Sequence, residues 1–220
     1  MLRFILSVAL ALVGSAASAQ TPFPVRTVLA GQVVTVPKGD YLLTRQAVVR
    51  VGGKLILEAG VSIKVEIGLP IQVYGEMEIR GTALEPVTIA PDALGICGTI
   101  AVYPTVGSPR PKLTATYLDL THTLNSTSLF LSGCDFAISN SRVANLSTAS
   151  SRICVAVTNG ASGVLSSCFL DGCKDRLTTP AVGVTVDSST ASVDLLETII
   201  ANSDMIRSGK QFTLISGSIE

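Results

Sequence analysis

Residues 49–65 read VRVGGKLILEAGVSIKV, and residues 71–89, which begin 22 positions later, read IQVYGEMEIRGTALEPVTI. In both stretches an apolar residue or a glycine occupies every second position for nine residues, and Gly53 is matched by Gly75. This alternation is typical of β-strand with one buried face. A glycine inside it indicates a bend or a close backbone approach. Gly31, another 22 residues before Gly53, extends the repeat towards the N-terminus.

The first copy of the repeat predicts which side chains are buried. Alternate side chains of a strand point to opposite faces, so the apolar set marks the core face. We expect Val49, Val51, Leu55, Leu57, Val61 and Ile63 in the core, bends at Gly53 and Gly60, and Arg50, Lys54 and Glu58 in solvent.

The repeat predicts a chain that winds as a coil. Each copy contains three short strand patterns and no helical stretch between them. Parallel strands need a crossover, and a coil that returns each strand beside its predecessor supplies one without helices. We therefore expect an all-β, single-stranded parallel β-helix with roughly 20–30 residues per coil. It should occupy residues 31–220, after a lead-in at residues 20–30.

The second half keeps this pattern at longer spacing. Three segments align on Ser141, Cys168 and Thr198, which are 27 and 30 residues apart: ISNSRVANLS (138–147), LSSCFLDGC (165–173) and LLETIIANS (195–203). Small inward residues at equivalent positions should stack as a ladder, with hydroxyl groups bonding along the axis of the coil. The longer spacing predicts longer loops between strands.

The stretch GKLILEAGVSIKV…IQVYGEMEIRGTALEPVTIAP resembles the opening coils of right-handed parallel β-helix proteins of the pectate-lyase-like superfamily. The segments ISNSRV and LSSCFL resemble its later coils, and the whole resemblance covers roughly residues 31–220. The coils are also similar to β-helix segments of Bark-beetle-type extracellular proteins, which are animal junction components. The resemblance implies a right-handed coil, in keeping with the general preference for right-handed crossovers.

The N-terminus has the pattern of a secretory signal. Residues 1–19 contain an early cation, Arg3, then an apolar run and a small-residue ending, Ala17-Ser18-Ala19. The run is too short for a membrane span, so we expect export: secretion, or delivery to the periplasm in a bacterial host. Loss of Arg3 leaves 15 of the 16 Lys and Arg residues against 16 Asp and Glu residues. Without a basic run, a nucleic-acid partner is not expected.

All five cysteines lie after the signal pattern. Export exposes them to oxidising conditions, which favours disulfides, and the odd number leaves one thiol over. Cys168 and Cys173 could close a short loop. A single histidine and no C-x-x-C pair make a zinc site a poor alternative. The disulfide candidates are Cys97, Cys134, Cys154, Cys168 and Cys173.

Other candidate sites are few. Asn125 and Asn145 begin N-x-Ser/Thr sequons and are glycosylation candidates, if the host glycosylates. The closest approach to a polar site is Asp171 with Asp175 and Arg176, although a solvated turn is the simpler interpretation. No residue is assigned a catalytic, cofactor-binding or metal-binding role, because the aspartates are scattered singly and no dense acidic cluster offers a calcium site.

Three further features receive structural interpretations. Arg110, in the Pro-rich SPRPK, is expected to be an exposed linker residue. His122 could be a general base by residue type, but a structural role is the simpler expectation. The four tyrosines fall at varied phases of the repeat and predict no aromatic platform: Tyr41, Tyr74, Tyr103 and Tyr117.

Two classes of function remain open. The first is a secreted, non-catalytic β-helix that acts in extracellular recognition, adhesion or surface structure, with a polysaccharide or another extracellular protein as partner. The second is a polysaccharide lyase or glycoside hydrolase acting on an acidic polysaccharide. It is supported only by analogy of fold.

The last residues predict a weak end of the coil. The sequence ends at FTLISGSIE (212–220), within the strand pattern. A bare last coil leaves backbone groups and apolar surface exposed. We expect this coil to be the least stable one or to associate with another chain. Hydrogen exchange with mass spectrometry should show low protection there; a strict monomer with strong protection over 212–220 would contradict this.

Overall fold

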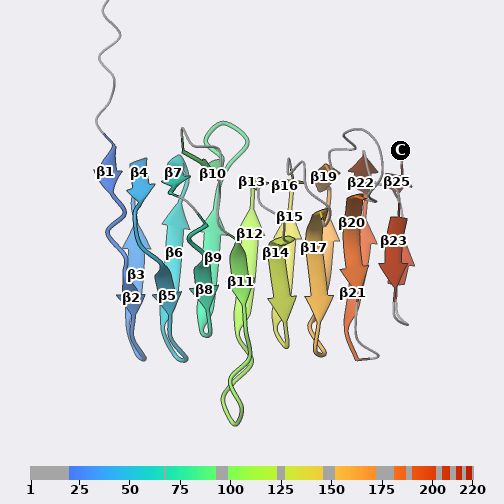
Figure 1. Cartoon of the computed structure of the whole chain (residues 1–220), viewed down its shortest axis with the longest axis horizontal. Helices are drawn as coiled ribbons and strands as arrows, with labels where there is room; N and C mark the ends of the chain where they lie inside the picture. The colour runs from blue at the N-terminus through green and yellow to red at the C-terminus, as the bar shows by residue number, and fades with distance from the viewer. Residues whose placement is uncertain are drawn as a thin grey trace, which may run out of the picture.

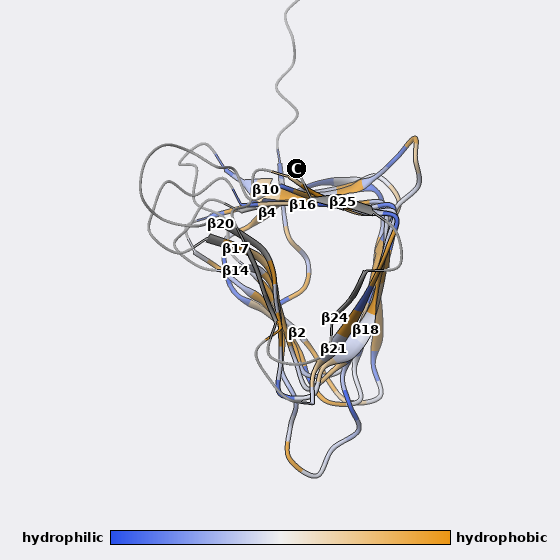
Figure 2. Cartoon of the chain, turned by 90° about the vertical axis from the view of Figure 1, so that its right-hand side faces the viewer, coloured by the Kyte–Doolittle hydropathy of each residue, from blue (hydrophilic) through white to orange (hydrophobic). Residues whose placement is uncertain are grey.

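The chain winds as a three-sided coil of parallel strands. The computed structural model describes residues 20–66, 68–92, 99–122, 127–145, 152–171, 181–186, 190–201, 205–208, 212–214 and 217–219. These contain strands and turns and no helix. The strands stack along the long axis from β1 (Thr21–Pro22) to β25 (Gly217–Ile219) (Figure 1). Viewed along that axis, the three sheets form the sides of a triangle (Figure 2).

Every third strand belongs to the same sheet. Sheet A contains β1, β4 (Gly39–Leu43), β7 (Val61–Val65), β10 (Val87–Pro91), β13 (Leu118–His122), β16 (Arg142–Asn145), β19 (Phe169–Asp171), β22 (Thr198–Ala201) and β25. Sheet B contains β2 (Thr27–Val28), β5 (Ala47–Val49), β8 (Ile71–Val73), β11 (Ile100–Val102), β14 (Thr127–Ser132), β17 (Arg152–Thr158), β20 (Ala181–Val186) and β23 (Met205–Ser208). Sheet C contains β3 (Val33–Val36), β6 (Lys54–Glu58), β9 (Glu76–Arg80), β12 (Lys112–Thr116), β15 (Asp135–Ser139), β18 (Ser162–Ser166), β21 (Ser192–Leu196) and β24 (Phe212–Leu214).

This architecture confirms the predicted all-β parallel β-helix. The interior of the triangle is filled by the inward side chains of all three sheets. In β7, Val61, Ile63 and Val65 are buried and the two residues between them are half-buried. Burying one such side chain contributes about 1.5–3 kcal/mol, so stacked inward columns provide most of the driving force for the fold.

The nine-residue alternation in the opening repeat spans a corner and not one strand. Sheet B strand β5 ends at Val49, and sheet C strand β6 begins at Lys54. Between them Gly52 takes the left-handed conformation, with φ 74°. A Cβ at Gly53 would lie 2.7 Å from the Leu29 carbonyl oxygen, so a side chain there would clash with the backbone of the preceding coil. Gly53 is thus required for close packing of the backbones, and Gly52 for the left-handed turn. Val51, predicted in the core, is half-buried at this corner, and that prediction was wrong.

The register refines the repeat. Lys54 pairs with Glu76, which keeps the predicted offset of 22 residues between the first two copies. Val33 pairs with Lys54, so the preceding offset is 21 and Gly31 aligns with Gly52 and not with Gly53. The Gly31 N–H accordingly donates to the Gly52 carbonyl at 2.8 Å.

The N-terminal end of the coil is closed by residues 23–26. Strands β1 and β2 already pair with β4 and β5, so the sheets begin before residue 31. The chain between β1 and β2 crosses the end of the triangle (Figure 2). It buries Phe23 and Val25, and the Phe23 ring meets Tyr41 edge to face at 6.0 Å. This segment covers the first layer of the core.

The corner between sheets C and A has a constant form in the second half. A single residue in the left-handed conformation makes each turn: Tyr117 (φ 48°), Asn140 (50°), Ser167 (50°) and Glu197 (48°). Their backbones stack, because Asn140 N–H donates to the Ser166 carbonyl at 2.9 Å and Ser167 N–H to the Leu196 carbonyl at 2.8 Å. The left-handed conformation, which is strained in residues other than glycine, is thus repeated at the corner between sheets C and A in four successive coils.

The predicted ladder of Ser141, Cys168 and Thr198 lies directly after these corners. The pairs Arg142–Phe169 and Phe169–Ile199 confirm the 27- and 30-residue spacings. All three ladder side chains are buried. Each bonds to a backbone carbonyl: Ser141 Oγ to Ser139 O at 2.7 Å, Cys168 Sγ to Ser166 O at 3.3 Å and Thr198 Oγ1 to Leu196 O at 3.1 Å. Thr198 Oγ1 donates to Leu165 O of the preceding coil at 3.1 Å.

We predict that Asn140→Val lowers the free energy of unfolding by about 1–2 kcal/mol, because a β-branched residue is disfavoured in the left-handed region. Asn140 is exposed, so the effect comes from the backbone. Asn140→Gly should change stability by roughly half of that or less. Urea denaturation measures both. The control is Ser139→Val, one residue earlier in a strand that favours valine; an equal loss in both valine variants would contradict the corner interpretation.

Candidate binding face

The outer face of sheet C carries a concentration of charged side chains. Alternate residues of β6, β9 and β12 point outwards, and because the strands pair in register, these residues form columns across the coils. The outward residues are Lys54, Ile56 and Glu58; Glu76, Glu78 and Arg80; and Lys112, Thr114 and Thr116.

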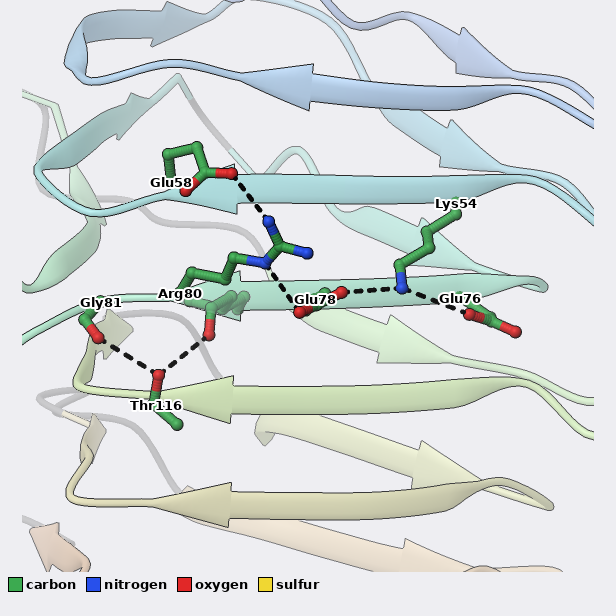
Figure 3. A network of polar contacts seen from close by, with 8 residues as sticks. Lys54, Glu58, Glu76, Glu78, Arg80, Gly81 and Thr116 are labelled. Atoms are coloured by element: carbon green, nitrogen blue, oxygen red, sulfur yellow. Dashed lines mark hydrogen bonds and ion pairs between the residues drawn. The ribbon is translucent and has the colours of Figure 1, made fainter.

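Glu78 is the centre of an ion-pair network (Figure 3). Its carboxylate accepts from Lys54 Nζ of the preceding coil and from Arg80 Nε of its own strand, each at 2.7 Å. Arg80 also contacts Glu58 at 3.1 Å, and Lys54 contacts Glu76 at 3.8 Å. The hydrogen bonds from Arg80 and Lys54 lower the pKa of Glu78 from 4.5 to about 2. Glu78 therefore stays ionised over the whole ordinary pH range.

Thr116 ties this network to the next coil. Its hydroxyl donates to the carbonyl oxygens of Gly81 at 3.2 Å and Ile79 at 3.4 Å (Figure 3). The chain leaving Arg80 is thereby fixed where it turns from sheet C towards sheet A.

Three shallow hollows follow one another along this side of the coil. A hollow of about 400 Å³ lies over β9, β12, β15 and β18, between Glu78 and Ser166. It shares Glu78 and Thr114 with a second hollow of about 230 Å³. The second shares Lys54 and Glu76 with a third of about 340 Å³, which lies at the corner between sheets B and C. We call the third the corner groove. Together they make a continuous track across successive coils.

Arg110 holds one wall of the corner groove in place. Its Nε contacts Asp135 Oδ1 at 2.9 Å, and its Nη2 donates to the carbonyls of Cys134 and Gly160, each at 2.9 Å. Arg110 is exposed, as predicted, but the linker interpretation was wrong, because its guanidinium group anchors the loop to two later coils.

A row of aromatic rings lies on the outer face of sheet B beside the corner groove. Tyr74 and Tyr103 stack with centroids 5.8 Å apart, and Phe130 meets Tyr103 at 5.4 Å. The pKa of Tyr103 is raised, first because its hydroxyl group is partly buried and second through its electrostatic interaction with Tyr74. The prediction that the tyrosines fall at varied phases was therefore wrong for Tyr74 and Tyr103. The signal was the match of IQVY (71–74) with IAVY (100–103), which puts both tyrosines at one position of the coil.

The polar group predicted around Asp171 has a different composition. Asp171 Oδ2 lies 3.4 Å from Arg142 Nη2, and Arg142 Nη1 lies 3.2 Å from Asp119 Oδ1, all on the outer face of sheet A. The other two predicted members, Asp175 and Arg176, lie outside the described residues.

No disulfide joins any two of Cys134, Cys154 and Cys168, which are all buried. Burial raises the pKa of the Cys134 thiol to about 12 and also raises that of Cys168, so neither thiol is an activated nucleophile. The candidates Cys97 and Cys173 lie outside the described residues, and with them the proposed Cys168–Cys173 loop.

The two glycosylation candidates and His122 fall at the ends of sheet A strands or beyond them. Asn145 is fully buried, and its amide donates to the Ile153 carbonyl at 3.1 Å, so the folded chain does not present it for modification. Asn125 lies outside the described residues, and so does the side chain of His122, whose backbone ends β13.

Among the described residues, no group of three or more His, Cys, Asp and Glu side chains could hold a metal ion. The same part of the chain contains no helix long and apolar enough to cross a membrane.

Comparisons with protein-family models, with curated proteins and with solved structures give no significant match.

We predict that Glu78→Gln lowers stability at pH 7 by about 0.5–1 kcal/mol, because two partly exposed ion pairs are lost. The wild-type carboxylate has a lower pKa in the folded chain than in the unfolded one, so its contribution is present above pH 4.5 and disappears as the pH falls to about 2. Denaturation curves across that range should converge for the two proteins.

The control is Glu66→Gln, since no ion pair involves Glu66 within the described residues. Its effect should be smaller and should not follow this pH course. A Glu78→Gln difference that persists unchanged at pH 2 would contradict the proposed network.

Proposed function

We propose that this protein is exported and acts as a non-catalytic β-helix that recognises an extracellular polymer or surface through the outer face of sheet C. The observation that carries the proposal is the fixed and internally neutralised charge along the track. Lys54, Glu78 and Arg80 hold one another in place across two coils. Such a face offers donors and acceptors in a set arrangement before any partner arrives, which lowers the entropic cost of binding.

The same network argues for binding over proton transfer. A general acid or base works best with a pKa near the working pH. Glu78, with a pKa of about 2, does not meet that condition, and its two cationic neighbours are engaged with carboxylates. The track also lies on packed strands and not on loops, which gives its side chains stable positions.

Export and superfamily membership are part of the proposal. The signal pattern at residues 1–19 supports secretion, or delivery to the periplasm of a bacterial host. The three-sided parallel coil supports placement in the pectate-lyase-like superfamily, together with the resemblance of its opening and later coils. A polysaccharide lyase or glycoside hydrolase is the competing function, and it shares these two supports.

The test uses the mature chain, from residue 20, and a panel of insoluble and soluble polysaccharides and matrix proteins. We predict binding without turnover, and Thr114→Arg should weaken it at least about tenfold, since a bulky cation there fills two of the hollows. The matched control is Thr88→Arg, an outward threonine on sheet A strand β10, which should bind like the wild type.

Two other outcomes would contradict the proposal. Shortened polymer chains or unsaturated products, measured by chromatography and ultraviolet absorbance with and without calcium, would replace the proposal by the enzyme. Absence of binding to every member of the panel, or equal losses in Thr114→Arg and Thr88→Arg, would refute recognition through sheet C.

A further inference from the structure

The corner groove combines apolar walls with a charged rim. It is lined by residues of successive coils, and its floor is made of glycine backbone at the turns between sheets B and C. A Cβ built on Gly31 would meet nothing within 4 Å, so the groove is open at that point. At about 340 Å³, the groove lies at the lower end of the volume range of small-molecule sites.

Val33 and Tyr74 supply its apolar surface. Val33 is 64% exposed, although it belongs to a strand, and its isopropyl group faces solvent at the groove. The Tyr74 ring is half-buried and is held by its stack on Tyr103. A ligand that covered both would remove apolar surface from water without reordering the ring.

The two cations on the rim of the groove, Lys54 and Arg110, are each paired with carboxylates. Lys54 is engaged with Glu78 and Glu76, and Arg110 is engaged with Asp135 and two backbone carbonyls. An anionic ligand would have to displace one of these carboxylates to gain a cation. A ligand with uncharged hydroxyl groups can instead bond to donor and acceptor together, because each ion pair presents both.

We propose that the corner groove binds one ring of a neutral glycan, with the C–H surface of the sugar against Val33 and Tyr74 and its hydroxyl groups on the Lys54–Glu76 pair. The inference depends on the proposed function, since it names the polymer that the sheet C track receives. The proposed ligand is neutral, whereas the competing lyase or hydrolase is expected to act on an acidic polysaccharide.

The test is calorimetric titration of the mature chain with neutral gluco-, manno- and xylo-oligosaccharides, and with oligogalacturonate as the acidic probe. We expect binding to at least one neutral series, little dependence of its affinity on salt, and no binding of oligogalacturonate. Tyr74→Ala should weaken the affinity at least about tenfold.

Tyr103→Ala is the matched control. Both variants remove the Tyr74–Tyr103 stack, but only Tyr74 lines the groove, so Tyr103→Ala should weaken the affinity by a clearly smaller factor than Tyr74→Ala. A second pair avoids the stack altogether: Val33→Asp should weaken binding, and Val106→Asp, on a fully exposed loop residue, should not. If the two variants of either pair weakened the affinity equally, the proposed glycan site would be wrong.

The inference and the proposed function fail in different ways. If an acidic glycan or a protein binds, and Thr114→Arg abolishes binding while Tyr74→Ala and Val33→Asp do not, recognition through sheet C stands and the neutral-sugar groove is wrong. If no member of either panel binds, both are wrong.

Discussion

Backbone hydrogen bonds between successive coils are the constraint on which the rest of the structure depends. They hold neighbouring strands about 4.8 Å apart and in register, so each side chain lies beside its counterpart one coil away. Inside the triangle this forces apolar residues into columns such as Leu55, Met77 and Leu113. Outside it, the same spacing brings Lys54 to Glu78 and Tyr74 to Tyr103. Core, ion-pair network and aromatic row are thus products of one geometry.

The fold could be predicted from sequence because burial restricts the residues at inward positions. The alternation around Gly53 and the spacing of Ser141, Cys168 and Thr198 both reflect core columns, and the structure has them in register. Corners were harder to predict. Val51 continues the alternation but lies where the chain turns, and only the conformation of Gly52 reveals the turn.

The candidate site was less predictable, because its residues come together through register and not through spacing along one segment. Nothing in the sequence around Glu78 marks it as the centre of a network, because its partner Lys54 lies one coil earlier. Arg110 contacts residues 24 and 50 positions away, after a loop whose length breaks the period. The aromatic row could have been predicted, since IQVY (71–74) and IAVY (100–103) share a pattern that places both tyrosines at one position of the coil.

Arg110 affects how the coil unfolds. In a solenoid each turn contacts only its neighbours, so the ends can separate turn by turn while the middle persists. The guanidinium group bonds to carbonyls on two different later turns, at Cys134 and Gly160, and so acts as a brace beyond the nearest neighbour. Separating those turns breaks this brace together with the sheet pairs. The coils from β12 to β18 are thereby given a more cooperative, all-or-none character than the ends, and one end of the proposed binding track lies on them.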